Sequence, residues 1–383
     1  MTIQAIITAD NHLDPSALNF GAARLKRKED HLRCFEEVVE YAKKNRPQLL
    51  LICGDLFDTM RPGNWVRARL MNHIRELHDG GIRVFMVSGH HDTPKSLEEG
   101  VSPLAVYGNS GNAVYFGNPS SPEPHHLQVD RLPVHIFGVG YNPFLAPGED
   151  PLSKLPQQPP EGINILMTHY PIEGFTGYFG EEPSIRLSSI PRGFHLVAAG
   201  HFHKHQKLSA GRTTIVYPGS TERASFAEEG EEKGFVWAEI QDDGEVHLEF
   251  LKTHARPFKT LEVEFPEQGD PIEDLKRRVS ALADPQLVLR VRLRGRVRPE
   301  RLAAYRRPHI LTYAQPRFFH FFIEEEFEVE YPQPIAALPR TTPLTELRRY
   351  FEGLLAAADE AERPILEEAL RLSETKLKEA GAW

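Results

Sequence analysis

Acidic residues and histidines follow five short apolar runs in this 383-residue chain, each directly after a turn of Gly, Ser or Thr. The runs are rich in Ile, Leu and Val and bounded by turn residues, a pattern that fits buried strands better than helices. Because open sheet folds place their sites beyond the carboxyl ends of strands, we expect these polar side chains to meet at one edge. They are Asp10 and His12, Asp55, His90 with His91 and Asp92, His169, and His201 with His203.

The side chains have the chemistry of metal ligands. Carboxylates and imidazoles without a thiolate suit Mn, Fe or Zn, whereas Mg and Ca prefer shells made of oxygen atoms alone. Any one such histidine would more often be a hydrogen-bonded structural residue, but five clusters in sequence order indicate a shared site. A central Asp can donate one oxygen to each of two cations, which then hold a phosphate and its attacking hydroxide.

The same residues carry a resemblance to a known family. Over about residues 1 to 250, the chain resembles the calcineurin-type metallophosphoesterase superfamily. The motifs that carry this resemblance are Asp10-x-His12, Gly54-Asp55-x-x-Asp58, Gly89-His90-His91-Asp92, His169 and Gly200-His201-x-His203. Within it, the Tyr217-Pro-Gly-Ser-Thr-Glu-Arg223 run, Ser225-Phe226 and Lys233-Gly-Phe235 are similar to the SbcD-type nucleases that process DNA ends. The resemblance implies an α+β fold, a metallophosphoesterase β-sandwich flanked by helices in four αββα layers. A small α/β capping domain and a C-terminal helical segment would follow.

The resemblance also implies roles for individual residues. Two Mn²⁺ ions are expected, with Mg²⁺ or another divalent metal as the alternative. One ion would be held by Asp10, His12, Asp55 and His203, and the other by Asp55, His90, His169 and His201. His91 would protonate the leaving 3′-oxygen or stabilise the transition state, and Asp58 would fix the tautomer of His91.

Three residues in or near these motifs, His90, Asp92 and His205, need a separate interpretation. The family pattern has Gly-Asn-His-Asp where this chain has Gly89-His90-His91-Asp92, so His90 replaces an amide ligand. Imidazole is a competent ligand, but it is bulkier than an amide side chain and has no carbonyl oxygen. The second metal position could therefore bind its ion fully or be weakened, and both interpretations stay open. Asp92 is expected to stabilise a turn. His205 is not expected to bind metal, because both coordination shells are filled without it.

Composition predicts a globular protein of two or three units, with 40% hydrophobic and 26% charged residues. The two cysteines, Cys34 and Cys53, are expected to be buried reduced thiols. No apolar stretch approaches the roughly 20 residues of a membrane helix, and the N-terminus has no basic lead, so we expect a cytoplasmic protein without membrane contact. No Gly-rich phosphate loop with its lysine appears, so no ATP site is expected in this chain.

The net charge of −9 disfavours a nucleic-acid partner, but its distribution is uneven. Between Arg290 and Arg317 there are nine arginines against one acid, Glu300. Strand alternation would place five of these arginines on one face, opposite Val291, Leu293 and Val297. They are Arg290, Arg292, Arg294, Arg296 and Arg298. DNA phosphate contact and the solvated outer face of a small sheet are both open interpretations, and the acidic blocks at 228–232 and 324–330 are interpreted as solvated loops or edges.

We divide the chain into a nuclease domain over residues 1–252, a DNA-capping domain over 253–331, a proline-rich linker over 332–343 and a helical partner-binding segment over 344–383. The first domain should contain helices over residues 30–45 and 64–78. The capping domain should contain strands over 259–265, 287–293 and 318–323, and helices over 272–282 and 299–305.

Two surfaces are predicted to bind partners. Thr342 can cap a helix with Pro343 at its first position, and Leu347, Phe351 and Leu354 on that helix would contact the coiled coil of an SbcC-type ATPase. A homodimer is also expected, because SbcD-type proteins pair through the region of the helix over 64–78. The alternative is that the apolar stripe of this helix packs on the chain's own sheet.

The sequence therefore predicts a Mn-dependent DNA phosphodiesterase, an exonuclease on double-stranded ends and an endonuclease on single strands or hairpins, acting with the ATPase in DNA repair. Two alternatives remain. One is a phosphatase or cyclic-nucleotide phosphodiesterase on the same scaffold. The other is a DNA-end-binding scaffold whose second metal site is weakened.

Overall fold

A computed structural model describes residues 1–16, 19–117, 123–146, 148–177, 182–330, 342–359 and 362–380. The chain forms two compact units. The first comprises Met1–Val263, Glu273–Leu293 and Arg307–Glu325, and the second Glu264–Ile272, Arg294–Arg306 and Glu326–Trp383. The division into four parts made from the sequence stays a prediction.

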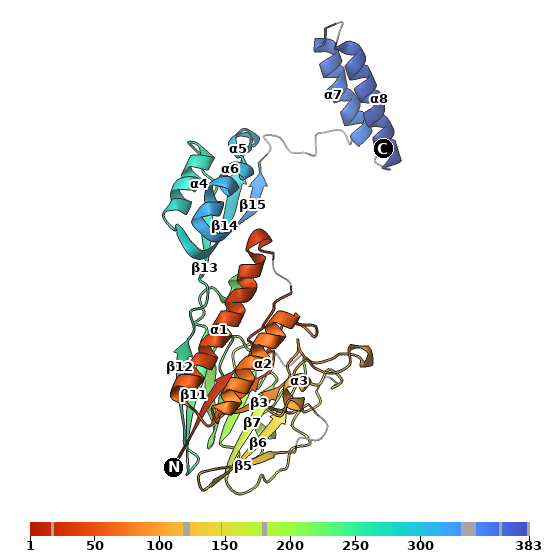
Figure 1. Cartoon of the computed structure of the whole chain (residues 1–383). Coiled ribbons are helices and arrows are strands. Elements are labelled where there is room, and N and C mark those ends of the chain that lie inside the picture. The colour runs from red at the N-terminus through yellow and green to blue at the C-terminus, as the bar shows by residue number, and fades with distance from the viewer. Residues whose placement is uncertain are drawn as a thin grey trace. The chain divides into compact units, whose positions relative to one another are not determined.

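Two six-stranded sheets form most of the first unit (Figure 1). The first sheet has the order β12-β11-β1-β2-β3-β4, in which β1 to β4 pair in parallel and β11 pairs antiparallel with both β1 and the edge strand β12. Its strands are β1 Thr2–Thr8, β2 Leu49–Cys53, β3 Arg83–Val87, β4 Val114–Tyr115, β11 Gly234–Gln241 and β12 Val246–Lys252.

The second sheet repeats this plan with the order β5-β6-β7-β8-β10-β9, parallel from β6 to β10 and antiparallel at both edges. Its strands are β5 His125–Val129, β6 Leu132–Val139, β7 Ile163–His169, β8 Leu196–Gly200, β9 Gln206–Ala210 and β10 Thr213–Tyr217. The five apolar runs noted in the sequence are thus β1, β2, β3, β7 and β8, as predicted.

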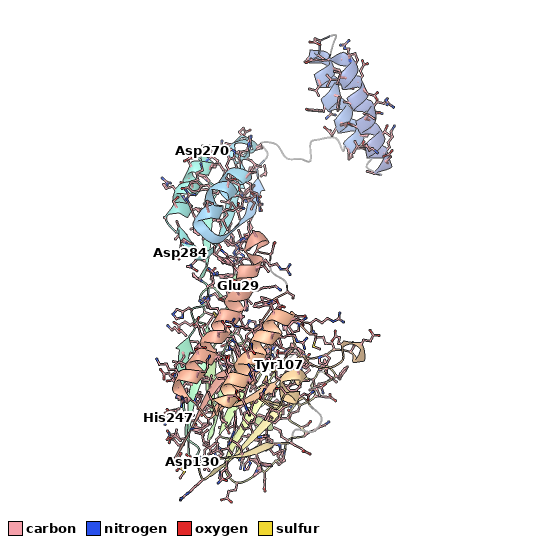
Figure 2. All side chains as sticks on the ribbon, viewed as in Figure 1. Glu29, Tyr107, Asp130, His247, Asp270 and Asp284 are labelled. Atoms are coloured by element: carbon pink, nitrogen blue, oxygen red, sulfur yellow. The ribbon has the colours of Figure 1, made fainter. Side chains whose placement is uncertain are left out.

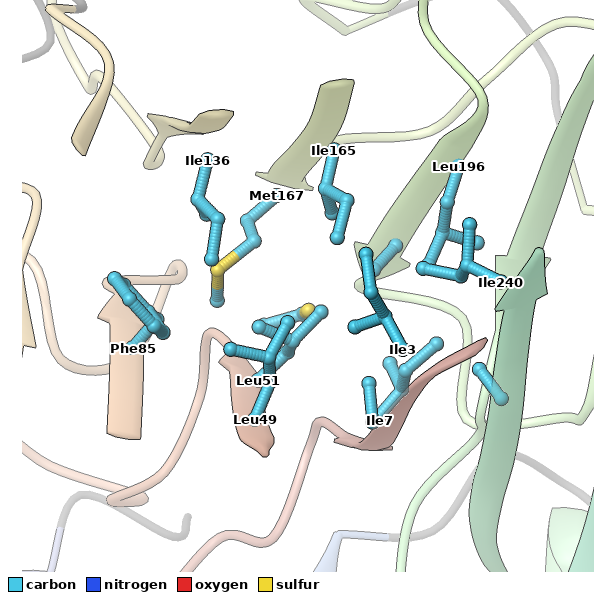
Figure 3. Packing of buried hydrophobic residues seen from close by; sticks show 14 of the residues in the cluster. Ile3, Ile7, Leu49, Leu51, Phe85, Ile136, Ile165, Met167, Leu196 and Ile240 are labelled. Atoms are coloured by element: carbon cyan, nitrogen blue, oxygen red, sulfur yellow. The ribbon is translucent and has the colours of Figure 1, made fainter. Parts of the chain in front are cut away.

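The main core lies between the two sheets. Side chains such as Ile7 and Leu51 from the first sheet pack with Ile136 and Ile165 from the second, and all four are fully buried (Figure 3). Apolar burial of this kind contributes about 25 cal/mol for each Å² removed from water, so this layer stabilises the packing of the two sheets against each other. The strand ends that carry the polar motifs are therefore held by a rigid support.

Helices cover the outer face of the first sheet (Figure 1). They are α1 Arg24–Asn45, α2 Asn64–Asp79 and α3 Ala105–Asn109. The stripe of α2, formed by Val66, Leu70, Ile74 and Leu77, is fully buried against this sheet and its neighbours. The hydroxyl of Tyr107 on α3, which is labelled in Figure 2, donates a hydrogen bond to the Arg67 carbonyl of α2 (3.3 Å).

The outer face of the second sheet carries a different layer. Leu152, Leu155, Ile172 and Phe175 from connecting segments pack there, together with Ile185 just before the short 3₁₀ helix Leu187–Ser189. The predicted α+β class and its layered sandwich are confirmed, with the difference that connecting segments form the described part of this fourth layer.

A third sheet has the order β13-β14-β15. Its strands are β13 Phe258–Glu264, β14 Asp284–Val297 and β15 Phe318–Val329, and the helices between them are α4 Pro271–Ser280, α5 Pro299–Ala304 and α6 Arg307–Ala314. The predicted elements are present, but β14 and β15 extend further than expected and α6 was missed. Val291, Leu293 and Val297 are buried while the intervening arginines are not, so the predicted alternation is confirmed.

The last two helices are α7 Pro343–Ala357 and α8 Arg363–Glu379. The Thr342 hydroxyl accepts a hydrogen bond from the Thr345 amide at the start of α7, and Pro343 is the first helical residue, as predicted. Residues 332–341 of the proline-rich linker, and residue 331 before it, lie outside the described residues. None of the helices in the described ranges combines the length and apolar composition that a membrane crossing needs.

Candidate metal centre

The carboxyl ends of β1, β2, β3, β7 and β8 bring the predicted ligands to one edge of the sandwich. Backbone hydrogen bonds align the turns after the first two strands, because the Asp10 amide donates to the Gly54 carbonyl (3.1 Å) and the His12 amide to the Asp55 carbonyl (3.0 Å). The His201 amide donates to both oxygens of Asp10 at 3.1 Å, which ties the two sheets together at the site.

The ligand atoms form four overlapping groups, within each of which they lie at most 4.8 Å apart. The groups are Asp10, His12 and His203; His90, His169 and His201; Asp10, Asp55 and His169; and His12, Asp55 and His91. All seven residues predicted as ligands occur in these groups. Asp55 belongs to two of them, in keeping with a carboxylate between two cation positions.

The donor set fits divalent cations. His169 Nε2 and His90 Nδ1 are buried and have no hydrogen-bond partner in the described part of the chain. His12 Nε2 and His203 Nε2 lie 3.1 Å apart. Two nitrogens bound to one ion at about 2.1 Å stand roughly 3.0 to 3.4 Å apart, so these two lone pairs are already spaced like neighbours in one coordination shell.

Electrostatics at the centre leave His90 and His201 neutral and favour the protonated form of His169. Burial, reinforced by the charge of His169, lowers the pKa of His90 and of His201 to about 3, so both are neutral at pH 7. Burial also disfavours charged His169, but Asp55, 3.3 Å from its Nε2, outweighs this effect and raises its pKa to about 10. For Asp55, burial opposes ionisation, yet the His169 charge holds the carboxyl pKa below its usual range. A cation here would replace the proton of His169.

Backbone strain is concentrated in the same residues. In the described ranges, four of the seven non-glycine residues with positive φ are predicted ligands: Asp10 (49°), His12 (45°), Asp55 (48°) and His201 (111°). Each such residue costs about 1–3 kcal/mol unless the surroundings enforce it. The rigid sandwich therefore holds these side chains in unfavourable backbone conformations, as is typical of functional sites.

Two glycines allow the turns that carry the ligands to approach the turn after β2 closely. A Cβ atom at Gly89 would lie 2.3 Å from Asp55 Oδ1, and one at Gly200 would lie 2.0 Å from the Cys53 carbonyl oxygen. Both distances are far inside van der Waals contact. The Gly-His and Gly-Asp pairs of the motifs thus have a packing reason as well as a chemical one.

His91 and Asp58 lie beside the ligands, but the contact between them differs from the one predicted from the sequence. The His91 ring donates from Nδ1 to the backbone carbonyl of Asp58 (3.1 Å), while the Asp58 carboxylate is 3.6 Å away, beyond hydrogen-bond range. That carboxylate is nearer to His12 Nδ1 (3.3 Å) and accepts two hydrogen bonds from Ser16. The main chain of Asp58 therefore fixes the tautomer of His91, and its side chain faces a ligand instead.

Asp92 and His205 have the structural roles expected of them. Asp92 accepts hydrogen bonds from the Leu56, Phe57 and Gly89 amides, which joins the turns after β2 and β3. His205 donates to the Tyr217 carbonyl at 2.9 Å and stacks on Phe250, with ring centroids 4.4 Å apart. Cys34 and Cys53 are buried and free, as predicted.

Sequence reasoning missed two carboxylates at the centre. Glu182 lies 3.3 Å from His201 Nε2 and 3.8 Å from His90 Nε2. Glu228 is hydrogen-bonded to His203 Nδ1 at 2.8 Å and is almost completely buried. The placement of Glu228 in an acidic block led to its interpretation as a solvated residue, although its neighbours Ser225-Phe226 and Lys233-Gly-Phe235 already stood out.

The arginine face of β14 is paired with acids. Arg292 Nε lies 2.7 Å from Glu324, and Arg294 Nε lies 3.0 Å from Glu326. Further contacts of 3.5–3.7 Å join Arg290 to Glu324 and Arg296 to Glu328 and Glu330. Most of the block 324–330 thus lies on the edge strand β15 as the facing row of a cross-strand ladder, so it is the expected solvated edge and not a loop. This pairing favours the structural interpretation, and DNA contact by these arginines and by Arg298 stays a prediction.

The predicted partner-binding residues of α7 take part in packing against α8. Phe351 is buried in this helical hairpin, and Leu347 and Leu354 are half-buried. Beside Leu354, an open hollow of about 420 Å³ is lined mainly by Ala357, Ala358, Ile365 and Leu366. The large apolar side chains that the hairpin leaves exposed are Tyr350, Ile365 and Leu372.

Comparison with known proteins agrees with this geometry. The chain is 26% identical to the DNA double-strand break repair protein Mre11 of Methanopyrus kandleri over 288 residues, 71% of this chain and 61% of the relative. It is 27% identical to the protein of the same name from Aeropyrum pernix over 273 residues, 68% of this chain and 63% of the relative.

The uncharacterized metallophosphoesterase YhaO of Bacillus subtilis is 25% identical over 261 residues, 65% of this chain and 60% of the relative. The chain thus spans about three fifths of the length of these relatives. The family model of calcineurin-like phosphoesterases matches residues 3–205, more than half of the chain. The resemblance noted in the sequence is confirmed: the chain belongs to the calcineurin-like phosphoesterase family.

Proposed function

We propose that the protein is a two-metal phosphodiesterase that cleaves DNA, with Mn²⁺ as the preferred ion. The observation that carries the proposal is that all seven predicted ligands fall into overlapping groups whose donor atoms lie within 4.8 Å of one another, with Asp55 in two of these groups. One cation would be held by Asp10, His12, Asp55 and His203, and the other by Asp55, His90, His169 and His201. Bound divalent ions lower the pKa of a water molecule and neutralise charge on phosphoryl oxygens.

The chain's own groups supply the remaining chemistry. His91 lies at the open rim of the centre with nearly half of its side chain exposed, so a leaving oxygen can reach it. Because Nδ1 donates to the Asp58 carbonyl, Nε2 is the atom that can carry a proton to the leaving 3′-oxygen. The His91 amide donates to Asp55 Oδ1 at 2.8 Å, which keeps the proton donor in register with the central carboxylate.

DNA is proposed as the substrate because two of the relatives compared above are DNA double-strand break repair proteins. The expected activities are exonuclease action on double-stranded ends and endonuclease action on single strands or hairpins. We further propose that α7 and α8 bind an SbcC-type ATPase. The hollow beside Leu354 and the exposed Tyr350, Ile365 and Leu372 offer apolar contact to a coiled coil.

A homodimer is part of the proposal, but the apolar stripe of α2 does not support it, since that stripe is buried in its own chain. A second copy would instead contact exposed apolar residues of this region, such as Trp65 on α2 and Val106 on α3. The mass of the purified chain at micromolar concentration tests this point. A monomer that DNA does not convert to a dimer would contradict it.

The function itself is tested with one purified sample of the full chain. Linear duplex DNA, a single-stranded hairpin, a small chromogenic phosphodiester, a chromogenic phosphomonoester and a cyclic nucleotide are each incubated with Mn²⁺. We expect both DNA substrates to be cleaved and the monoester to stay intact. Turnover of only the small compounds would indicate a phosphatase or cyclic-nucleotide phosphodiesterase, and DNA binding without cleavage would indicate a scaffold.

A further inference from the structure

The segment from Tyr217 to Phe235 surrounds one predicted ligand, His203. The Ser220 amide and the Lys233 ammonium group both donate to the His203 carbonyl oxygen, at 3.0 and 3.1 Å. Gly219 has a φ of 80°, and a Cβ atom there would lie 2.8 Å from the same oxygen. This motif, which supplied only a family resemblance in the sequence, is in the structure a cradle for the main chain of His203.

Glu228 completes the cradle on the side-chain side. Its Oε1 lies 2.8 Å from His203 Nδ1, and its Oε2 accepts from the Lys233 ammonium group at 2.7 Å and from the Ala224 amide at 3.0 Å. Lys233 is itself 2% exposed. Both carboxylate oxygens are therefore fully engaged, and a buried cation holds the carboxylate in place.

The loop that carries Glu228 is fixed independently of His203. The Arg223 guanidinium group donates to the carbonyls of Glu228 (3.3 Å), Glu231 (2.6 Å) and Arg256 (3.0 Å). With the Ala255 carbonyl (3.4 Å), four carbonyls thus converge on one side chain. The position of the carboxylate is set by this loop and does not depend on the histidine that it contacts.

This arrangement determines which nitrogen of His203 faces the centre. A neutral imidazole carries one proton, and a carboxylate acceptor at Nδ1 keeps that proton there. The lone pair is then on Nε2, which lies 3.1 Å from His12 Nε2 and 3.9 Å from Asp10 Oδ1. We propose that Glu228, held by Lys233, is a positioning residue that presents the Nε2 lone pair of His203 to the first cation.

The inference rests on the proposed metal-binding function and adds a residue that acts through a ligand. A purely structural role for Glu228 is the competing explanation, because the same carboxylate also holds Lys233. The chain offers a matched control: Glu231 lies 2.8 Å from the same ammonium group, but its side chain has no contact with His203 among those described. The two carboxylates share the structural partner and differ in the contact with the ligand.

The experiment compares Glu228→Gln and Glu231→Gln in the full chain, with Mn²⁺ affinity and stoichiometry measured by calorimetry and the free ion followed by electron paramagnetic resonance. Loss of an outer partner of a metal-bound histidine typically weakens binding by about 10- to 100-fold. We expect Glu228→Gln to weaken one of two ions to this degree and to spare the other. Glu231→Gln should bind both ions within about twofold of the wild-type affinity, because its partner is an ammonium group rather than a ligand.

Wild-type affinity in Glu228→Gln would overturn the inference, and so would equal weakening by both variants. If Glu228→Gln does not fold by circular dichroism, the wild-type protein loaded with Zn²⁺ decides the matter through the ¹⁵N spectrum of its histidine rings. The inference requires His203 to carry its proton on Nδ1, and a proton on Nε2 would refute it. Failure of the wild-type protein to bind any Mn²⁺ would instead refute the proposed function, so the two failures are distinguishable.

Discussion

The metal centre and the arginine face of β14 both gather charged or titratable side chains along strands, yet they treat them in opposite ways. On β14, Arg292 and Arg294 each meet a glutamate of β15 at 3.0 Å or less, in positions open to solvent. At the centre, His169 Nε2 and His90 Nδ1 are buried and lack a hydrogen-bond partner among the described residues. The arginine face pairs its charged groups within the chain, whereas the metal centre keeps buried ring nitrogens available for a bound cation.

The energies of the two regions explain why this difference is informative. An exposed ion pair contributes about 0.2–1 kcal/mol, so a ladder of such pairs forms and persists with little consequence for function. A buried polar atom without a partner costs about 1–3 kcal/mol. Several such atoms, together with the strained backbone at Asp10, His12 and His201, lower the stability of the fold. They are retained only where they contribute to function. Buried ring nitrogens without partners that occur together with strained backbone in the same turns, rather than charge density, thus mark the functional region.

The largest effect is expected from the central carboxylate. Asp55→Asn removes the charge shared by the two ligand groups, and loss of about 4 kcal/mol of charge stabilisation corresponds to roughly a 10³-fold lower kcat/KM. Bound Mn²⁺ should fall with it. Asp130→Asn is the matched control, because Asp130 has a similar positive φ of 54° but is an exposed residue between β5 and β6 and belongs to none of the ligand groups. Equal losses in both variants would point to backbone strain rather than metal binding.

His91→Ala separates proton transfer from metal binding. Removal of a general acid typically lowers the rate by about 10²- to 10⁴-fold. We expect a loss in this range on linear DNA with both ions retained, measured by cleavage kinetics and metal analysis of one preparation. His247→Ala, an exposed histidine of β12, serves as the control. Loss of metal from the His91 variant would place His91 among the ligands.

The pH dependence of metal binding tests the electrostatics of the centre. Burial opposes the charged form of His169, but Asp55 and Asp10 raise its pKa to about 10, so below that pH an ion must displace its proton. Mn²⁺ affinity should therefore rise with pH, by about tenfold per unit for one displaced proton, between pH 6.5 and 8. Calorimetric titrations at several pH values measure the slope. A flat profile would mean that His169 does not exchange a proton for the ion.

The smallest effect is expected on the arginine face. Arg294→Gln should change the free energy of unfolding by no more than about 1 kcal/mol, because its partner Glu326 is also solvent-exposed. DNA affinity measured in EDTA should keep its salt dependence. A decrease of about one in the slope of log K against log salt would instead assign a phosphate contact to Arg294. The double variant with Glu326→Gln controls for the unpaired glutamate.

Much of the first unit could be predicted from the sequence. Each apolar run had a length, a composition and flanking turn residues that fit a buried strand better than a helix, and each ended in a turn. Because parallel strands of a sheet end at the same edge, the ligands could be brought together without a structure. The α2 helix over 64–79 likewise followed from its apolar stripe.

What could not be predicted depended on contacts between distant segments. The alternation of Arg290 to Arg298 already indicated a strand through Val297, but β15 continues to Val329, where its glutamates meet Arg292 and Arg296, and strand propensity alone does not indicate such pairs. Glu228 is similar, since its burial arises from His203 and Lys233 approaching from other parts of the fold. The helix α6 has almost no amphipathic pattern and so offered no periodic signal.

A crystal structure of the full chain with Mn²⁺, analysed by anomalous scattering at the manganese edge, tests the central claim most directly. The account predicts two peaks about 3.5–4 Å apart, with Asp55 bound to both, His203 Nε2 bound to one and His169 Nε2 to the other. Absence of density between these side chains, or two ions that do not share Asp55, would contradict it.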